Sequence, residues 1–262
     1  LCELLDVTNY LEYFALNIYI GNEDWPHNNY RLYRYYPAAG ESLREAPFDG
    51  KWRYLLHDMD FSYGIYGKPP TTDFLGRLIN DNGASPLFAR LMKREDCRQI
   101  FVRKTLDLAN GALSPAILDS VLDKMHNSRL NEIRHTLGSK LVDPWVNERE
   151  LEKRINEIKR YGAARKAYIL DSYQKVFGYG SIYELEVTPA DGCKVKINSY
   201  VTDSYFTGSY YSDLSTTISA ILPAGKRLDY WLVNGEKKEA NELLIDSSMI
   251  KKNSVTVSFV TK

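Results

Sequence analysis

The sequence has no excess of charge of either sign, few cysteines and no long apolar run. Lysine plus arginine and aspartate plus glutamate both number 34, so no overall field exists to hold nucleic acid or an anionic membrane. The three cysteines, Cys2, Cys97 and Cys193, fit neither a zinc motif nor a disulfide framework. No apolar run approaches the roughly 18 residues that span a bilayer, and no signal peptide is recognisable. We therefore expect no nucleic-acid partner and no membrane span.

The residues that are present fall into two halves of different periodicity. Hydrophobic residues make up 44% of the 262, enough for a sizeable core. The chain starts with Leu rather than Met, which favours a piece of a longer protein. The pattern is mostly helical up to about residue 177, and from 181 it alternates with a period of two. We predict an α+β fold, with a mostly helical domain over residues 1–178 and a small all-β domain over 181–262.

The helical half carries start and stop signals with a clear mechanism. Asp6 or Thr8 can cap a helix that ends at Gly21. The stretches 85–92 and 114–125 each place serine at the N-cap and proline at the first helical position. These signals predict three separate helix starts.

Apolar stripes predict which helical faces are buried. A last long helix is predicted over residues 147–176, stopping at a glycine-rich end. Its inward positions are Leu151, Ile155 and Ile158. The helix that starts near residue 114 has one stripe that we interpret as core, made of Leu118, Val121, Leu122 and Met125.

The all-β half contains five alternating runs separated by turn residues. The predicted strands are 183–189, 193–199, 216–222, 228–234 and 254–261. Trp231 lies in the middle of such a run, so we interpret it as a core anchor, with a sugar-stacking platform as the alternative. A denser aromatic cluster suits partner binding, although tyrosine also gathers in strands through propensity alone. It consists of Tyr200, Tyr205, Phe206, Tyr210 and Tyr211.

Carboxylates and an amide stand at one end of a predicted hairpin in the helical half. The strand-like runs 29–36 and 51–57 are joined by a polar loop. The start of the first strand of a hairpin lies beside the end of the second. The side chains expected to converge there are those of Asp24, Asn29, Asp58 and Asp60.

Such a cluster suits a hard cation. Carboxylate and amide oxygens are ligands for Mg²⁺ or Mn²⁺, and Mg²⁺ is usually completed by water and substrate phosphates. The cluster therefore suggests phosphoryl transfer, with one aspartate free to accept a proton from an attacking hydroxyl. Aspartate and asparagine at strand ends are, however, more often turn formers and caps, and this alternative stays open for each residue taken alone.

Two motifs resemble those of a known family. The segment NEDWPHNNYRLYR, followed by GKWRYLLHDMDFSYG, is similar to the motifs of the CotH kinase family, atypical protein kinases named after a spore-coat protein. The resemblance extends to RYGAARKAYILDSYQKVFG and covers residues 1–178. It implies that this domain is a kinase-like C-terminal lobe with a hairpin at the active site.

The resemblance also implies roles for individual residues. Asp24 matches the catalytic-loop aspartate. Asn29 and Asp58 match residues that bind the metal and its nucleotide, and Asp60 is the second metal-binding aspartate of the pair. His57 is expected to be a structural hydrogen-bonding residue.

The implied activity is transfer of the γ-phosphoryl group of ATP to serine or threonine of a protein, with Mg²⁺ or Mn²⁺. The phosphoacceptor is expected to be extracytoplasmic, and the location extracellular or at a bacterial cell surface. The sequence has no G-x-G-x-x-G and no G-x-x-x-x-G-K-[ST] motif. We therefore expect the full-length protein to bind Mg-ATP, and this piece, without a nucleotide-binding lobe, to be inactive or nearly so.

Two alternatives remain at this point. The β half resembles the repeat modules of bacterial surface proteins of the Listeria internalin B-repeat type. On the first alternative, the chain is a non-catalytic surface or adhesion protein that binds a glycan or a protein through this module. A metal-dependent hydrolase is the less favoured alternative, because the cluster lacks histidine ligands.

Overall fold

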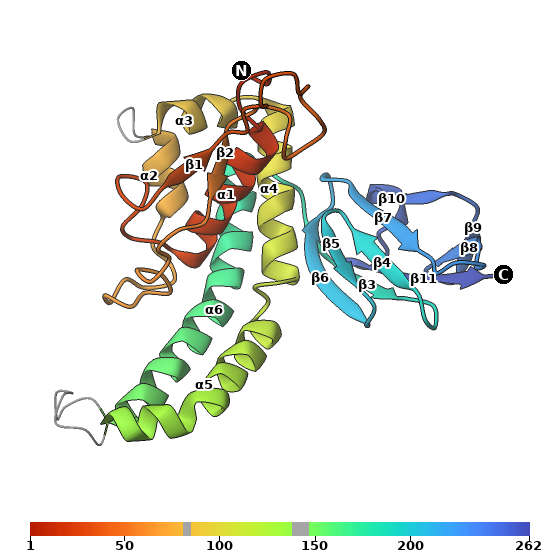
Figure 1. Ribbon diagram of the computed structural model, residues 1–262. Coiled ribbons are helices and arrows are strands. Elements are labelled where there is room, and N and C mark those ends of the chain that lie inside the picture. Colours follow the sequence, from red (N-terminus) through yellow and green to blue (C-terminus); the bar gives the residue numbers. More distant parts are fainter. Residues whose placement is uncertain (81–84, 138–146) are drawn as a thin grey trace. The chain divides into compact units, whose positions relative to one another are not determined.

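A computed structural model of the protein describes residues 1–80, 85–137 and 147–262 (Figure 1). The described chain forms two compact units, Leu1–Phe101 with Leu113–Tyr168, and Val102–Ala112 with Ile169–Lys262. Helices dominate up to residue 177 and strands from residue 182, so the fold is α+β, as predicted. The domain division at residues 178–181 remains a prediction.

The helical part contains a short hairpin among its helices. Its elements are α1 (Val7–Ile20), β1 (Arg31–Tyr33), β2 (Arg53–Leu55), α2 (Phe74–Asn80), α3 (Pro86–Met92), α4 (Glu95–Asn110), α5 (Pro115–Leu137) and α6 (Glu148–Phe177). The predicted helix starts at Asp6, Ser85 and Ser114 are confirmed. Ser85 occupies the N-cap position of α3, but its side chain makes no capping hydrogen bond.

Helix α1 is the core element of the first unit. Asp6 caps it by accepting a hydrogen bond from the backbone N–H of Asn9 at 3.0 Å. Gly21 ends it with a left-handed φ of 67°, a conformation that favours glycine. Side chains on most of its circumference are buried, so α1 is covered on more than one side. The buried apolar residues are Tyr10, Leu11, Tyr13, Phe14, Ala15, Ile18, Tyr19 and Ile20.

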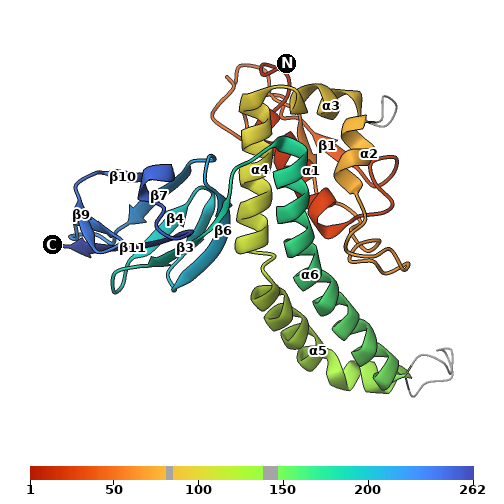
Figure 2. The ribbon, with the colours of Figure 1, turned by 180° about the vertical axis from the view of Figure 1, so that it is seen from behind.

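The apolar stripe of α5 is not core, and that prediction was wrong. Val121 and Met125 are 47% and 56% exposed, and no described residue of α5 is buried. Helix α5 runs beside the first part of α6 as a two-helix hairpin, so a single neighbour covers it (Figures 1 and 2). An ion pair of 2.6 Å between Lys159 and Asp123 joins the two helices. The inward positions of α6, Leu151, Ile155 and Ile158, are half-buried.

Arg165 of α6 is 1% exposed and donates hydrogen bonds to four backbone carbonyl oxygens. Two acceptors belong to the last turn of α1, Tyr19 at 3.0 Å and Ile18 at 2.7 Å. The other two belong to the loop before α2, Pro70 at 2.6 Å and Thr72 at 2.8 Å. The planar guanidinium therefore joins three segments that are distant in the sequence.

We predict that Arg165→Lys lowers the free energy of unfolding by about 2 to 4 kcal/mol. Lysine keeps the charge but cannot reach both pairs of carbonyl oxygens, so buried acceptors lose their donors. Urea denaturation measures the loss. The matched control is Arg149→Lys, an exposed arginine on the same helix, which should change stability by less than about 0.5 kcal/mol. An equal, small effect of both substitutions would contradict this account of Arg165.

The second unit contains two β-sheets. Its strands are β3 (Ile182–Thr188), β4 (Lys194–Ile197), β5 (Tyr200–Thr202), β6 (Phe206–Tyr211), β7 (Thr216–Ile221), β8 (Leu228–Val233), β9 (Glu236–Lys238), β10 (Glu242–Ile245) and β11 (Ser254–Thr261). A short 3-10 helix, Ser247–Met249, precedes β11. The strand orders are β10-β7-β4-β5 and β6-β3-β11-β8-β9. Only β3 and β11 pair in parallel among the described strands.

The five predicted strands are confirmed as β3, β4, β7, β8 and β11, whereas β5, β6, β9 and β10 were missed. Strands β5 and β9 have only three residues, and β6 contains Gly208, so none of these gives a long alternating pattern. Trp231 is completely buried, with its ring centroid 5.2 Å from that of Phe259 and its indole N–H bonded to the Ala240 carbonyl at 2.9 Å. It is a core anchor, as predicted, and not a sugar-stacking platform.

Most of the tyrosine-rich cluster is buried, so its interpretation as a partner surface was wrong for three members. Phe206, Tyr210 and Tyr211 are 5%, 1% and 0% exposed. Strand β6 is covered on both faces, and the Tyr211 hydroxyl donates to the Leu170 carbonyl at 2.8 Å. Tyr205 is 59% exposed, which leaves it as the accessible ring of the cluster together with the half-buried Tyr200.

Asp107 attaches the end of α4 to the β4–β5 turn within the second unit. Its carboxylate accepts hydrogen bonds from the Asn198 amide at 3.0 Å, and from the Ser199 backbone N–H at 2.9 Å and hydroxyl. Burial nevertheless raises the pKa of Asp107, and these hydrogen bonds oppose that rise only in part. The folded protein therefore binds a proton at Asp107 more tightly than the unfolded chain does.

This raised pKa fixes the sign of a pH dependence. Between the ordinary pKa and the raised one, the folded state carries the proton and the unfolded state does not, so lowering the pH favours folding at this site. We predict that the unfolding free energy of the wild type minus that of Asp107→Asn increases as the pH falls below neutrality, because only the wild type gains a proton at this position. Urea denaturation at a series of pH values measures it. A difference that shrinks instead would mean that the hydrogen bonds outweigh burial.

Candidate functional site

The hairpin brings the two predicted motifs together. Strands β1 and β2 pair antiparallel, with Arg31 opposite Leu55 and Tyr33 opposite Arg53. The segment before Arg31 therefore lies beside the segment after Leu55, as predicted. The strands are shorter than the predicted runs, three residues each.

Two buried asparagines hold the loop that carries Asp24. Asn17 and Asn22 are both 0% exposed. The Asn22 side chain donates to Asn17 Oδ1 at 2.9 Å, and its backbone N–H donates to the Asn17 carbonyl at 3.0 Å. Asn22 Oδ1 then accepts the backbone N–H of Asp24 at 3.2 Å. The position of Asp24 is thus set by a buried amide pair at the end of α1.

Asn17 and Asn22 are not among the residues predicted from the sequence. Their signal is an amide on the apolar side of a helix, three residues after Phe14, followed by a second amide just beyond the helix end. A polar side chain at such a position is buried only with hydrogen-bond partners.

Backbone hydrogen bonds join the two motif loops directly. The N–H of Glu23 donates to the Phe61 carbonyl at 2.9 Å, and the N–H of Tyr63 donates to the Ile20 carbonyl at 2.8 Å. The loop after β2 is therefore attached to the end of α1. Asp58 has a left-handed φ of 53°, which is uncommon for a residue with a side chain.

Both carboxylate oxygens of Asp24 are held by amides. Asn28 Nδ2 donates to Oδ1 at 2.7 Å, and Asn29 Nδ2 donates to Oδ2 at 2.8 Å. The amide nitrogen of Asn29 is therefore engaged with Asp24, and its Oδ1 is the atom that can serve as a cation ligand.

Asp58 and Asp60 repel one another. The pKa of Asp58 is raised, first by a hydrogen bond with Asp60 and by the charge of that group. Asp24 adds to the rise through its charge, whereas His57 opposes it. Asp24 is hydrogen-bonded to Asn29, and the charges of Asp24 and Asp60 act on Asp58, so these residues lie in one neighbourhood. Their assignment as a metal-binding and catalytic site stays a prediction.

The donor set fits a hard divalent cation held in part by other ligands. Among the described residues there is no group of three or more His, Cys, Asp or Glu side chains that could hold a metal ion. Two adjacent carboxylates and one amide oxygen leave several positions for water and phosphate, as Mg²⁺ requires. Repulsion between Asp58 and Asp60 is also relieved by a cation placed between them.

The family model described as CotH kinase protein matches residues 1–169. The chain belongs to the CotH kinase family. This match contains both motif segments and most of α6, which confirms the family resemblance. No curated protein and no solved structure matches the chain. No helix in the described ranges is long and apolar enough to cross a membrane.

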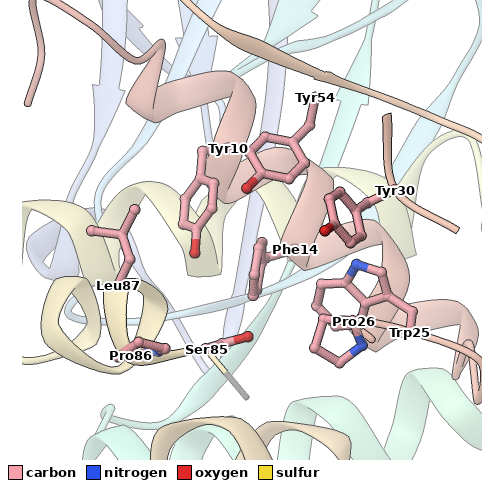
Figure 3. Close-up of a pocket in the computed structure, with 9 residues that line it drawn as sticks. All are labelled: Tyr10, Phe14, Trp25, Pro26, Tyr30, Tyr54, Ser85, Pro86 and Leu87. Atoms are coloured by element: carbon pink, nitrogen blue, oxygen red, sulfur yellow. The ribbon is translucent and has the colours of Figure 1, made fainter. Parts of the chain in front are cut away.

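An aromatic hollow of about 300 Å³ adjoins the acidic cluster of this CotH-family chain (Figure 3). Trp25, which follows Asp24, and Tyr30, which follows Asn29, both line it. Tyr10 and Phe14 of α1 form its floor, and the start of α3 closes one side. The segment from Asp24 to Asn29 therefore has a buried aromatic anchor at its first end only, since Trp25 is 1% exposed whereas Tyr30, at the rim, is 54% exposed.

We predict that Asn22→Ala lowers the free energy of unfolding by about 1 to 3 kcal/mol. The substitution leaves Asn17 Oδ1 and the N–H of Asp24 without their partners. Asn28→Ala is the control, because Asn28 is exposed and its loss should cost less than about 0.5 kcal/mol. Urea denaturation compares the two. Equal values would mean that the buried amide pair does not hold the loop.

Proposed function

We propose that this CotH-family protein transfers the γ-phosphoryl group of ATP to a serine or threonine hydroxyl of a protein, with Mg²⁺ or Mn²⁺. The observation that carries the proposal is the convergence of Asp24, Asn29, Asp58 and Asp60 at one end of the hairpin. Membership of the CotH kinase family supports a kinase-related function.

Each residue has a distinct part in this proposal. Asn29 Oδ1 and the carboxylates of Asp58 and Asp60 are the ligands for the cation. The cation, when bound, neutralises charge on the phosphates. Asp24 is positioned by Asn28 and Asn29, so that one of its carboxylate oxygens can accept a proton.

The balance of the reaction is simple. The acceptor hydroxyl oxygen forms a bond to the γ-phosphorus while the bond from that phosphorus to the β,γ-bridging oxygen breaks. The hydroxyl proton passes to the carboxylate of Asp24, and ADP leaves. The chain's main contribution is to position the acceptor and hold charge, because this reaction needs little covalent chemistry from the protein.

An extracellular or cell-surface location belongs to the same proposal and rests on the resemblance to kinases of a bacterial spore coat. The alternative of an adhesion protein has less support, because Phe206, Tyr210, Tyr211 and Trp231 are buried. No observation favours the metal-dependent hydrolase.

Metal binding and turnover test the proposal separately. We predict that the chain binds Mn²⁺, and that Asp58→Asn weakens the affinity at least tenfold, because one of two adjacent carboxylates is lost. Isothermal titration calorimetry measures the affinity. Asp123→Asn is the control, an exposed aspartate on α5 whose loss should leave Mn²⁺ affinity unchanged.

Turnover is measured with the protein in the form that the cell makes, using ATP and a serine-containing acceptor. Asp24→Asn should retain Mn²⁺ binding and lower kcat by about 10²-fold or more, as expected for loss of a general base. Unchanged turnover in both Asp24→Asn and Asp58→Asn would overturn the proposed mechanism.

A further inference from the structure

A second hollow, of about 460 Å³, lies between the loop that follows Asp60 and the middle of α6. The loop between β2 and α2 lies beside α6 in both views (Figures 1 and 2). Tyr63 and Gly64 line the hollow, so its wall begins three residues after Asp60. The hollow is thus a neighbour of the proposed cation site along the same loop.

The hollow is positively charged. Its lining includes three cations, Lys68, Arg154 and Arg160, and one acid, Glu157. Arg154 is already neutralised, at 2.9 Å from Glu157 and 3.2 Å from Glu150. In the part of the chain that the structure describes, Lys68 and Arg160 have no ion-pair partner.

The wall that carries Lys68 is fixed in place. Gly64 has a φ of 68°, and a Cβ there would collide with the Lys68 carbonyl and lie 2.9 Å from the Tyr161 ring. The N–H of Tyr63 is bonded to α1, and the carbonyl of Pro70 is bonded to Arg165. The backbone on either side of Lys68 is therefore held before any ligand binds, which reduces the entropic cost of binding.

Charge complementarity indicates the ligand. Two unpaired cations match a phosphate monoester, which carries nearly two negative charges at neutral pH and three acceptor oxygens. The Arg160 guanidinium can bond two phosphate oxygens, while Lys68 supplies a point charge. A carboxylate carries only one charge and would neutralise half of the pair.

We propose that this hollow binds a phosphoserine or phosphothreonine side chain of the polypeptide acceptor. The proposal rests on the proposed function and deepens it, because it names an acceptor that is already phosphorylated near the serine or threonine to be modified. A polypeptide whose hydroxyl lies at Asp24 reaches the hollow along the loop that joins Asp60 to Lys68. Phosphorylation of one residue of the acceptor would then favour phosphorylation of a nearby serine or threonine of the same polypeptide.

The test uses a panel of short, fluorescently labelled peptides with one acceptor serine and a phosphoserine placed at successive flanking positions. A second panel carries unmodified serine at the same positions. Fluorescence anisotropy measures binding to the full chain in EDTA and without ATP. We predict that at least one phosphopeptide binds tenfold or more tightly than its unmodified partner, and that raising the salt concentration reduces this preference.

Matched variants locate the binding. Lys68→Ala with Arg160→Ala should abolish the preference for the phosphopeptide. Arg149→Ala, an exposed arginine on the same helix outside the hollow, should keep it. Thermal melts by circular dichroism confirm that the variants fold, as expected for exposed side chains. The proposal is overturned if the preference for the phosphopeptide survives the double substitution, or if no position of the phosphoserine gives a preference.

Other sources of the phosphate are outcomes of the same assay. If inorganic phosphate competes at the same concentration as the phosphopeptide, the hollow is a small-anion site. If anionic-lipid vesicles bind and the double variant loses that binding, the hollow is a lipid-headgroup site. Either result overturns the proposal. Because the assay contains no metal and no ATP, Asp58→Asn should bind the phosphopeptide normally. Absence of turnover therefore leaves the binding result intact, and failure of the proposed function can be told apart from failure of this proposal.

Discussion

Arg165 places a guanidinium among four backbone carbonyl oxygens, two of them from the last turn of α1. The last carbonyls of a helix have no partner within the helix, and they carry the negative end of its dipole. Arg165 supplies both the donors and the positive charge at this end. Because the same side chain bonds the carbonyls of Pro70 and Thr72, the loop after the hairpin is held against the end of α1.

The candidate site is built on the same helix end. Asn17 and Asn22 fix the chain that leaves α1, and the backbone pairs of Glu23 and Tyr63 fix the returning loop. Three carboxylates near the negative end of a helix repel one another and the dipole, which disfavours the cluster without a counter-charge. A divalent cation would relieve that repulsion, so the electrostatics that make the cluster costly also favour the proposed cation site.

The sequence predicted features that depend on local pattern. The cap at Asp6, the stop at Gly21, the hairpin and the convergence of its two ends all follow from periodicity, turn residues and strand geometry. Burial that depends on distant neighbours was not predictable. The stripe of α5 has the period of a core helix but only α6 beside it, and β6 is covered on both faces although its sequence resembles an exposed aromatic surface. The partners of Arg165 are carbonyl groups, which leave no trace in the sequence.

The net charge of zero conceals a local separation of charge. Asp58 and Asp60 stand at one end of the loop before α2, and Lys68 stands further along it, where it lines the same hollow as Arg160. At physiological ionic strength charges are screened beyond about 8 Å, so exposed groups of opposite sign on one loop act on different ligands rather than cancel. A chain without an overall field must hold charged ligands locally. The loop that Arg165 holds therefore carries both proposed binding surfaces, one for a cation and one for an anion, and the position of each depends on the same buried guanidinium.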